Sequence, residues 1–138
     1  GIKGKLKIEL IRDGKVVQTE KVNNIIVTTG KALVATLVSG SGTSFSHMAI
    51  GTDNTTEVIG DSSLTAEVGR VTLTSKATTN NVIDYIGDFP AGTGTGTIVE
   101  AGILNASSSG TMLNRATFSS VNKTASDALK ITWDVTLG

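Results

Sequence analysis

The sequence predicts a mainly β protein, an antiparallel β-sandwich of about eight strands with one short helix. Three observations predict this class: polar and apolar residues alternate along short segments, turn-forming residues separate these segments, and only one segment has a helical apolar spacing. The 138 residues include 16 glycines, 1 proline and only 17% charged residues, which suits strands that expose hydroxyl groups. Because no repeat or composition change divides the chain, we expect one domain over residues 1–138.

The opening hairpin has the clearest turn signal. Residues 5–12 alternate, and their apolar positions share one face: Leu6, Ile8 and Leu10. Asp13-Gly14 then supplies a two-residue turn, because glycine tolerates the positive φ that such a turn requires. Residues 15–22 return as the second strand.

One segment has helical rather than β periodicity. Thr28 or Thr29 is expected to cap a helix that ends at Ser39-Gly40-Ser41-Gly42. The apolar positions of this helix are Leu33, Val34, Leu37 and Val38.

Six further strands are expected at short spacing, over residues 45–51, 70–77, 82–89, 98–105, 111–118 and 129–137. The last of these, which contains Trp133, has the most regular alternation in the chain. Between the strands we expect a polar loop at 52–60, a turn or one-turn helix at 61–64, and a polar connection at 121–127.

Charge and composition argue against several classes of function. With 12 basic and 12 acidic residues the net charge is zero, so nucleic acid is not an expected partner. The absence of cysteine excludes disulfides and thiolate metal sites. No apolar run approaches the ~20 residues of a membrane span, and no apolar segment of a signal peptide follows the first lysines. We therefore expect no membrane partner.

Nothing in the sequence indicates catalysis or a cofactor. His47 is the only histidine, no nucleophile motif accompanies it, and we interpret it as structural. The glycine-rich segment 92–96 lacks the Lys-Ser/Thr of a phosphate-binding loop. We expect a non-enzymatic protein that needs no cofactor.

One loop is rich in oxygen ligands, with Asp53, Asn54, Glu57 and Asp61 close together. Calcium prefers six to eight such oxygens, but the spacing departs from an EF-hand. We interpret the segment as a solvated loop, with a calcium site as the alternative.

Four charges lie in or beside apolar strands: Glu67, Arg70, Glu100 and Arg115. Because an unpaired buried arginine is costly, we expect these four residues to form an internal ion-pair network that fixes strand register. The alternative is that one pair reaches across a subunit interface.

Three segments, taken in order, resemble the N-terminal domain of phage tail-collar fibre proteins. They are His47-Met48-Ala49-Ile50-Gly51-Thr52-Asp53, Ser63-Leu64-Thr65-Ala66-Glu67-Val68-Gly69-Arg70, and Val99-Glu100-Ala101-Gly102-Ile103-Leu104-Asn105. Nearly the whole chain also resembles small standalone phage structural proteins with this core. That likeness adds the opening hairpin, Asn24-Ile25-Ile26-Val27, Thr29-Gly30-Lys31, and a terminal pattern from Asn122-Lys123-Thr124 through Asp127 to Trp133.

The resemblance implies a structural protein of a tailed-phage virion, assembled in the host cytoplasm. Collar fibre proteins continue into shafts, whereas this chain ends at Gly138 after a predicted strand. We therefore expect a capsid decoration (cement) protein that acts as a homo-oligomer, such as a trimer, on the major capsid protein. The alternative is a small tail, neck, baseplate or tail-fibre attachment protein with partners in the tail.

A low-complexity loop is the candidate contact segment of such a protein. It comprises Pro90, Gly92, Thr93, Gly94, Thr95 and Gly96, and carries no side chain able to anchor it. We expect this loop to lie at a subunit contact or a distal tip.

A carbohydrate-binding β-sandwich adhesin is the alternative from another class, with a host glycan as its partner. Outward threonine and asparagine side chains would permit it. However, glycan sites usually stack a sugar ring on an exposed aromatic residue. Here the few aromatic residues fall mostly on predicted core faces.

Overall fold

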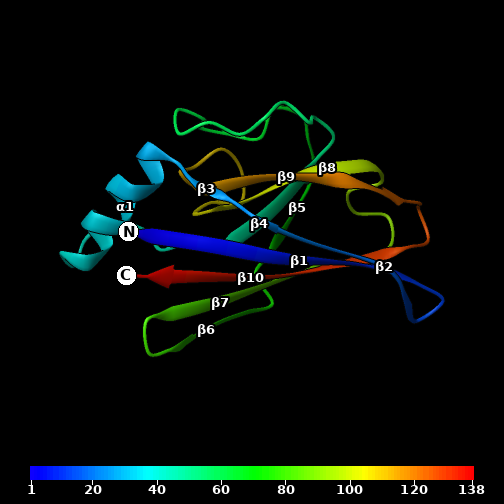
Figure 1. Ribbon diagram of the computed structural model, residues 1–138, viewed down its shortest axis with the longest axis horizontal. Coiled ribbons are helices and arrows are strands. Elements are labelled where there is room, and N and C mark those ends of the chain that lie inside the picture. Colours follow the sequence, from blue (N-terminus) through cyan, green and yellow to red (C-terminus); the bar gives the residue numbers. More distant parts are fainter.

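The computed structural model describes all 138 residues and consists of two five-stranded antiparallel sheets and one helix (Figure 1). The predicted class, a mainly β sandwich with one short helix, is confirmed, with ten strands instead of about eight. The first sheet has the order β2-β1-β10-β7-β6 and the second has the order β3-β9-β8-β4-β5. The elements are β1 (Ile2–Arg12), β2 (Lys15–Asn23), β3 (Ile25–Ile26), α1 (Thr28–Val38), β4 (His47–Gly51), β5 (Glu67–Thr72), β6 (Ser75–Thr79), β7 (Val82–Phe89), β8 (Gly96–Leu104), β9 (Met112–Lys123) and β10 (Ala128–Leu137).

The first sheet confirms the predicted alternation. β1 pairs with β10, and its inward residues Leu6, Ile8 and Leu10 are at most 3% exposed. The hairpin turn also forms as predicted, because Asp13 and Gly14 both have positive φ, at 52° and 75°. The inward residues of this sheet meet those of the second sheet in one cluster of 20 buried residues, which includes Trp133 at 0% exposure.

The middle of the second sheet, where β4, β8 and the first part of β9 lie side by side, is buried on both faces. One face joins the core, and residues 52–66, here called the covering loop, lie over the other. A second cluster forms beneath this loop: Val27, Ala49, Leu64, Leu104 and Met112. This double coverage explains why β8 is buried without interruption from Ile98 to Leu104.

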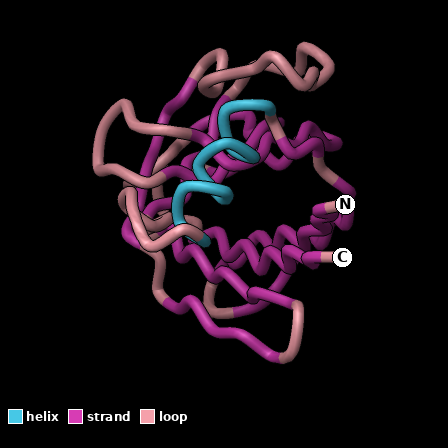
Figure 2. Tube along the Cα trace, turned by 90° about the vertical axis from the view of Figure 1, so that its left-hand side faces the viewer, coloured by secondary structure: helices cyan, strands magenta, loops and turns pink.

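α1 lies across one end of the sandwich, between the two sheets (Figure 2). It packs on β9 through Gly30, the only buried residue of the helix, and a Cβ at that position would lie 2.7 Å from Leu113 Cα. The predicted cap is wrong: the N-cap is Val27, and it makes no side-chain hydrogen bond. The helix has 11 residues and is too short to cross a membrane.

Three predicted boundaries are wrong. The expected strand 70–77 is two strands, since the chain leaves the second sheet after β5 and enters the first sheet at β6. No helical turn forms at 61–64; instead a turn closes at 58–61, where Asp61 N donates to Val58 O. Finally, β9 continues to Lys123 and takes up part of the expected polar connection.

Candidate functional site

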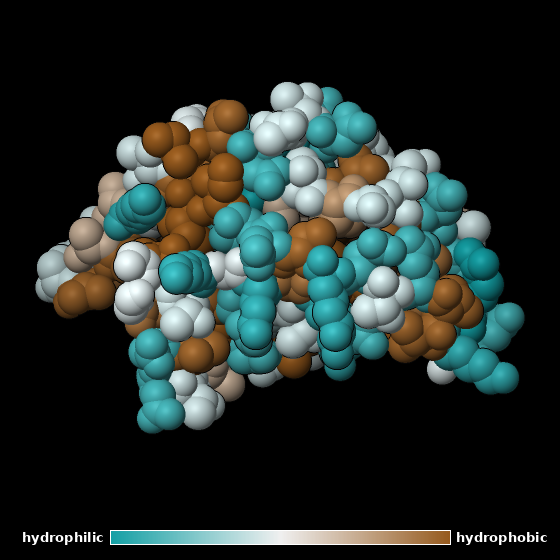
Figure 3. Space-filling view, viewed as in Figure 1, coloured by the Kyte–Doolittle hydropathy of each residue, from teal (hydrophilic) through white to brown (hydrophobic).

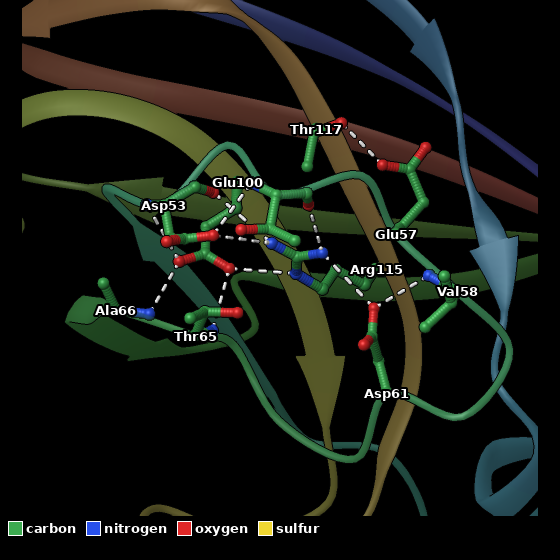
Figure 4. A network of polar contacts seen from close by, with 10 residues as sticks. Asp53, Glu57, Val58, Asp61, Thr65, Ala66, Glu100, Arg115 and Thr117 are labelled. Atoms are coloured by element: carbon green, nitrogen blue, oxygen red, sulfur yellow. Dashed lines mark hydrogen bonds and ion pairs between the residues drawn. The ribbon is translucent and has the colours of Figure 1, made fainter.

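A network of buried polar groups joins the covering loop to the outer face of the second sheet (Figure 4). It is built from four side chains, Asp53, Asp61, Glu100 and Arg115, and is called the polar network below. Glu100 lies on β8 and Arg115 lies on the adjacent β9. Both are almost completely buried, at 0% and 1% exposure, so the network contains a fully buried ion pair.

Glu100 holds the covering loop through its backbone. Its Oε2 accepts hydrogen bonds from Ala66 N at 2.8 Å and Asp53 N at 3.2 Å, and its Oε1 accepts one from Thr65 N at 3.0 Å. Arg115 Nε donates to the same Oε1 at 3.0 Å. Four donors therefore satisfy a carboxylate that would otherwise be very costly to bury.

Gly51 makes room for this carboxylate. It lies opposite Glu100 in the ladder between β4 and β8. A Cβ at position 51 would overlap Glu100 Oε2 and lie 2.6 Å from Ala66 O. The glycine of the Ala49-Ile50-Gly51 segment is therefore required by packing.

Arg115 continues the network into the first part of the covering loop. Its Nη1 donates to Thr55 O at 2.8 Å and to Asp61 Oδ2 at 3.3 Å. Its Nη2 lies 3.7 Å from Asp53 Oδ1. Hydrogen bonds from Thr55, with a smaller contribution from Arg115, hold the pKa of the Asp53 carboxyl below its ordinary value.

The oxygen-rich loop considered as a calcium site is thus organised around an arginine. Asp61 Oδ2 is shared between Arg115 and Val58 N, and Glu57 accepts a hydrogen bond from the Thr117 hydroxyl. No group of three acidic or histidine side chains is arranged to hold a metal ion. Chemically, the guanidinium supplies the positive charge that these carboxylates surround.

The four residues predicted as one network form two separate pairs. Glu100 pairs with Arg115 as described, and Glu67 pairs with Arg70 through two hydrogen bonds of 2.7 and 2.9 Å. No hydrogen bond or ion pair joins the two pairs. Arg70 also donates to the carbonyls of Ala106 and Ser109, each at 2.9 Å, so this second pair anchors the turn between β8 and β9.

The predicted contact loop packs against its own chain at its centre. Gly94 is buried and lies so close to Gly69 on β5 that a Cβ at position 69 would be 2.8 Å from Gly94 Cα. Pro90 O accepts a hydrogen bond from Lys123 Nζ at 3.0 Å. Gly92 and Thr95 are exposed, so these parts of the loop remain free for the predicted contact.

His47 has no arrangement typical of a catalytic base. Its Nδ1 lies 2.8 Å from the hydroxyl of Ser46, its chain neighbour, and its Nε2 lies 3.4 Å from the hydroxyl of Thr72. No carboxylate orients the ring, as a hydrolytic triad would need.

Sequence reasoning missed a second group of buried charges, near the β1–β2 hairpin. Asp127, at 1% exposure, accepts two hydrogen bonds from Arg12 at 2.9 and 3.0 Å and one from Thr124 N at 2.9 Å. These bonds, led by those from Arg12, hold the pKa of Asp127 far below its ordinary value. Burial lowers the pKa of Lys123. The sequence carried two signals: Lys123, Thr124 and Asp127 belong to the terminal pattern of the resemblance, and Asp127 lies three residues after Thr124, a spacing at which a carboxylate can accept from the backbone N–H.

Asn24 was also missed as a structural residue. Its Oδ1 accepts from Trp133 Nε1 at 2.6 Å and from Asn114 Nδ2 at 3.3 Å, while its own N donates to Gly4 O. One amide side chain therefore connects the two sheets through β9 and β10.

Comparison with known proteins adds no relative: no family model, no curated protein and no solved structure matches this chain.

Proposed function

We propose that this protein is a non-enzymatic structural component of a tailed-phage virion, and specifically a decoration protein of the capsid surface. The proposal rests on the order of the segments that resemble phage tail-collar and small phage structural proteins. One observation in the structure supports it above others: those three segments form one packed unit.

The unit consists of β8, β4 and β5, which are adjacent in the second sheet. Glu100 of the third segment binds the backbone of Thr65 and Ala66 in the second segment, and Gly51 of the first segment makes room for it. The most distinctive residues of the pattern therefore act on one another. A pattern of this kind is expected of a scaffold, since a catalytic pattern converges on a cavity instead.

The remaining parts of the pattern also have packing roles. Gly30 allows α1 to approach β9, Asn24 connects the sheets, and Asp127 binds Arg12. We infer that the protein works by presenting a rigid surface to neighbouring subunits. Many equivalent sites on a particle compensate for modest affinity at each one.

Separation of heads and tails tests the proposal. Particles of the phage that encodes this chain are dissociated, the two fractions are purified, and each is analysed by mass spectrometry. We expect peptides of this chain in the head fraction, at a fixed ratio to the major capsid protein. Recovery in the tail fraction would favour the neck, baseplate or fibre-attachment alternative, and absence from both fractions would overturn the proposal.

The glycan-binding alternative finds less support. All five aromatic residues are buried, with exposures between 0% and 8%: Phe45, Tyr85, Phe89, Phe118 and Trp133. None is available as a platform for a sugar ring. Specific hits on a glycan array would revive this alternative.

A further inference from the structure

We propose that the end of the molecule covered by α1 binds the same end of a second copy across a twofold axis. This inference deepens the proposed function, on which it rests for its biological meaning, by naming a surface and its partner. It is carried by an apolar pocket and an exposed apolar pair that lie at opposite ends of one helix.

The pocket opens beside the C-terminal half of α1, between the helix and the first sheet. It has a volume of about 170 Å³, and every residue that lines it is apolar or aromatic, including Leu37, Val38, Tyr85 and Leu137. Val38 is 80% exposed and Leu137 is 37% exposed, so the pocket continues into an open apolar surface.

The size of the pocket indicates what occupies it. Ligand pockets usually measure about 300–1,000 Å³, whereas a cavity of about 150 Å³ holds a benzene-sized group. The pocket therefore suits one aliphatic side chain better than a metabolite. Tyr85 lines the wall and is only 4% exposed, and burial raises its pKa to about 12, so the pocket holds no charged side chain.

A matching apolar pair lies at the other end of the helix. Val58 and Ile59 are 55% and 62% exposed, and Thr28 N donates to Ile59 O at 2.9 Å, which fixes them beside the first residue of α1. Figure 3 shows hydrophobic surface at this end of the molecule. The pair and the pocket are separated by the length of α1, roughly 16 Å for 11 residues.

A twofold axis through the middle of α1 brings the Val58–Ile59 pair of each copy over the pocket of the other. The two helices are then antiparallel. No acidic residue lies in the first turn of α1 and no basic residue lies in the last, so no side chain neutralises the partial charges of the helix dipole. In the antiparallel arrangement the positive N-terminal end of each helix lies beside the negative C-terminal end of its partner. The contact is isologous and closes at two copies.

The charge distribution favours this end of the partner over the opposite one. Residues 25–46 contain one charged residue, Lys31, whereas residues 12–21 around the hairpin turn contain five. The two carboxylates beside the Val58–Ile59 pair already have partners within the chain, since Glu57 accepts from Thr117 and Asp61 accepts from Arg115. The exposed pair Val16 and Val17 lies in that hairpin, and docking it on the pocket would desolvate neighbouring charges without partners. Uncharged surface is typical of the centre of an interface. A standard dimer buries about 800 Å² per copy, or about an eighth of the 6644 Å² surface of this chain.

Disulfide trapping tests the geometry, because the natural chain contains no cysteine. Ile59→Cys and Val38→Cys change exposed side chains. We expect an equimolar mixture of the two variants to form a covalent dimer on mild oxidation, while each variant alone does not. The variant that carries both cysteines should form covalent dimers but no larger covalent oligomers, because the twofold contact closes at two copies. The matched control mixes Val38→Cys with Val17→Cys, which is 51% exposed at the far end of the molecule, and should not crosslink.

Sedimentation equilibrium supplies an independent readout. At about 100 µM, where even a ~10 µM interface is mostly occupied, we expect twice the 14.1 kDa mass of the chain. Ile59→Lys should give a folded monomer whose melting temperature falls only by the amount that dimerisation contributed, and Val17→Lys should remain a dimer. A monomer at all concentrations, a trimer, or equal crosslinking of the control would overturn the inference. Recovery of the chain in virions would leave the proposed function standing in each of those cases.

Discussion

At the scale of single residues, the Arg115 guanidinium joins two strands and the covering loop. It connects β9 to β8 through Glu100 and to the covering loop through Thr55, Asp61 and Asp53. Breaking a buried pair leaves the other charge uncompensated. Replacing both residues of the pair by uncharged ones costs far less stability, because neither charge is then buried alone.

We predict that Arg115→Met lowers the free energy of unfolding by about 3–5 kcal/mol. Three backbone N–H groups still bind Glu100 in this variant, but the positive charge is gone. The measurement is urea denaturation, with amide hydrogen exchange to show that residues 52–66 exchange faster. Lys7→Met, which removes a partly exposed ion pair, is the control and should cost less than about 1 kcal/mol.

A double variant measures how much of this loss comes from the interaction between Glu100 and Arg115 themselves. Glu100→Gln combined with Arg115→Met should be less destabilising than the sum of the two single changes, because the charges interact directly. Additive effects would show that the pair is not energetically coupled.

A like-charge pair on the outer face of the first sheet lowers stability at neutral pH, whereas the Glu100–Arg115 ion pair raises it. Asp84 on β7 lies directly opposite Asp134 on β10. Partial burial and then the neighbouring Asp134 raise the pKa of Asp84. The native state therefore holds this proton more tightly than the unfolded chain does. Its contribution to stability rises as the pH falls from the raised value toward the ordinary aspartate pKa of about 3.9.

We predict that Asp134→Asn lowers the pKa of Asp84 toward that ordinary value, because the neighbouring charge is removed. Carbon-13 NMR titration of the side-chain carboxyl groups measures this directly. The stability of the variant should also gain less on acidification than that of the natural protein. Asp88→Asn, on the same strand but opposite Lys130, is the control. An unchanged Asp84 titration in Asp134→Asn would contradict the assignment.

At the scale of secondary-structure elements, the position of α1 depends on a glycine. Gly30 faces the backbone of Leu113 on β9, which cannot move aside as a flexible side chain can. An alanine at an ordinary helix position is better than glycine by about 1 kcal/mol. At position 30 we expect alanine to be less stable than glycine, because its Cβ would overlap the backbone of β9.

We predict that Gly30→Ala destabilises the protein by about 1–3 kcal/mol through overpacking against β9. Gly60→Ala is the control, because nothing lies within 4 Å of a Cβ at that position, and it should change stability by less than about 1 kcal/mol. Thermal unfolding of the two variants measures the difference. Stabilisation by Gly30→Ala would show that the helix can shift away from the sheet.

The elements that the sequence predicted well are those with one buried and one exposed face. β1 and β10 show a period of two because water lies on their outer face and the core on the other. The join between β5 and β6 could not be predicted in this way. Val71, Leu73 and Ser75 keep alternating through the point where the chain changes sheets, so periodicity carries no mark of the crossing.

The polar network was predicted only in part, for a reason of sequence distance. The apolar residues around Glu100 and Arg115 in the sequence indicate that both charges need partners. The contacts of Arg115 with Asp53 and Asp61 depend on a loop that starts about 60 residues earlier and folds over the sheet. Local patterns cannot encode such a contact, and the same loop therefore read as a solvated or calcium-binding segment.

At the scale of the whole molecule, the two sheets share one core. The cluster of 20 buried residues draws on β1, β7 and β10 of the first sheet and on β4, β8 and β9 of the second. Asn24 adds a polar connection between them. Each sheet buries its inner face against the other, so unfolding of one exposes the inner face of both.

This shared core predicts that the protein unfolds in one cooperative transition. Trp133 is the only tryptophan, lies at 0% exposure in the centre of the first sheet, and reports on the core by fluorescence. Far-UV circular dichroism reports on all ten strands. We expect the two signals to give the same midpoint and slope in urea, since loss of the core around Trp133 removes the surface on which the second sheet packs. Asn24→Ala should lower both midpoints together, because it leaves Trp133 Nε1 without its partner. A fluorescence midpoint well below that of circular dichroism would contradict this account, because the second sheet, with α1 and the covering loop, would then be stable alone.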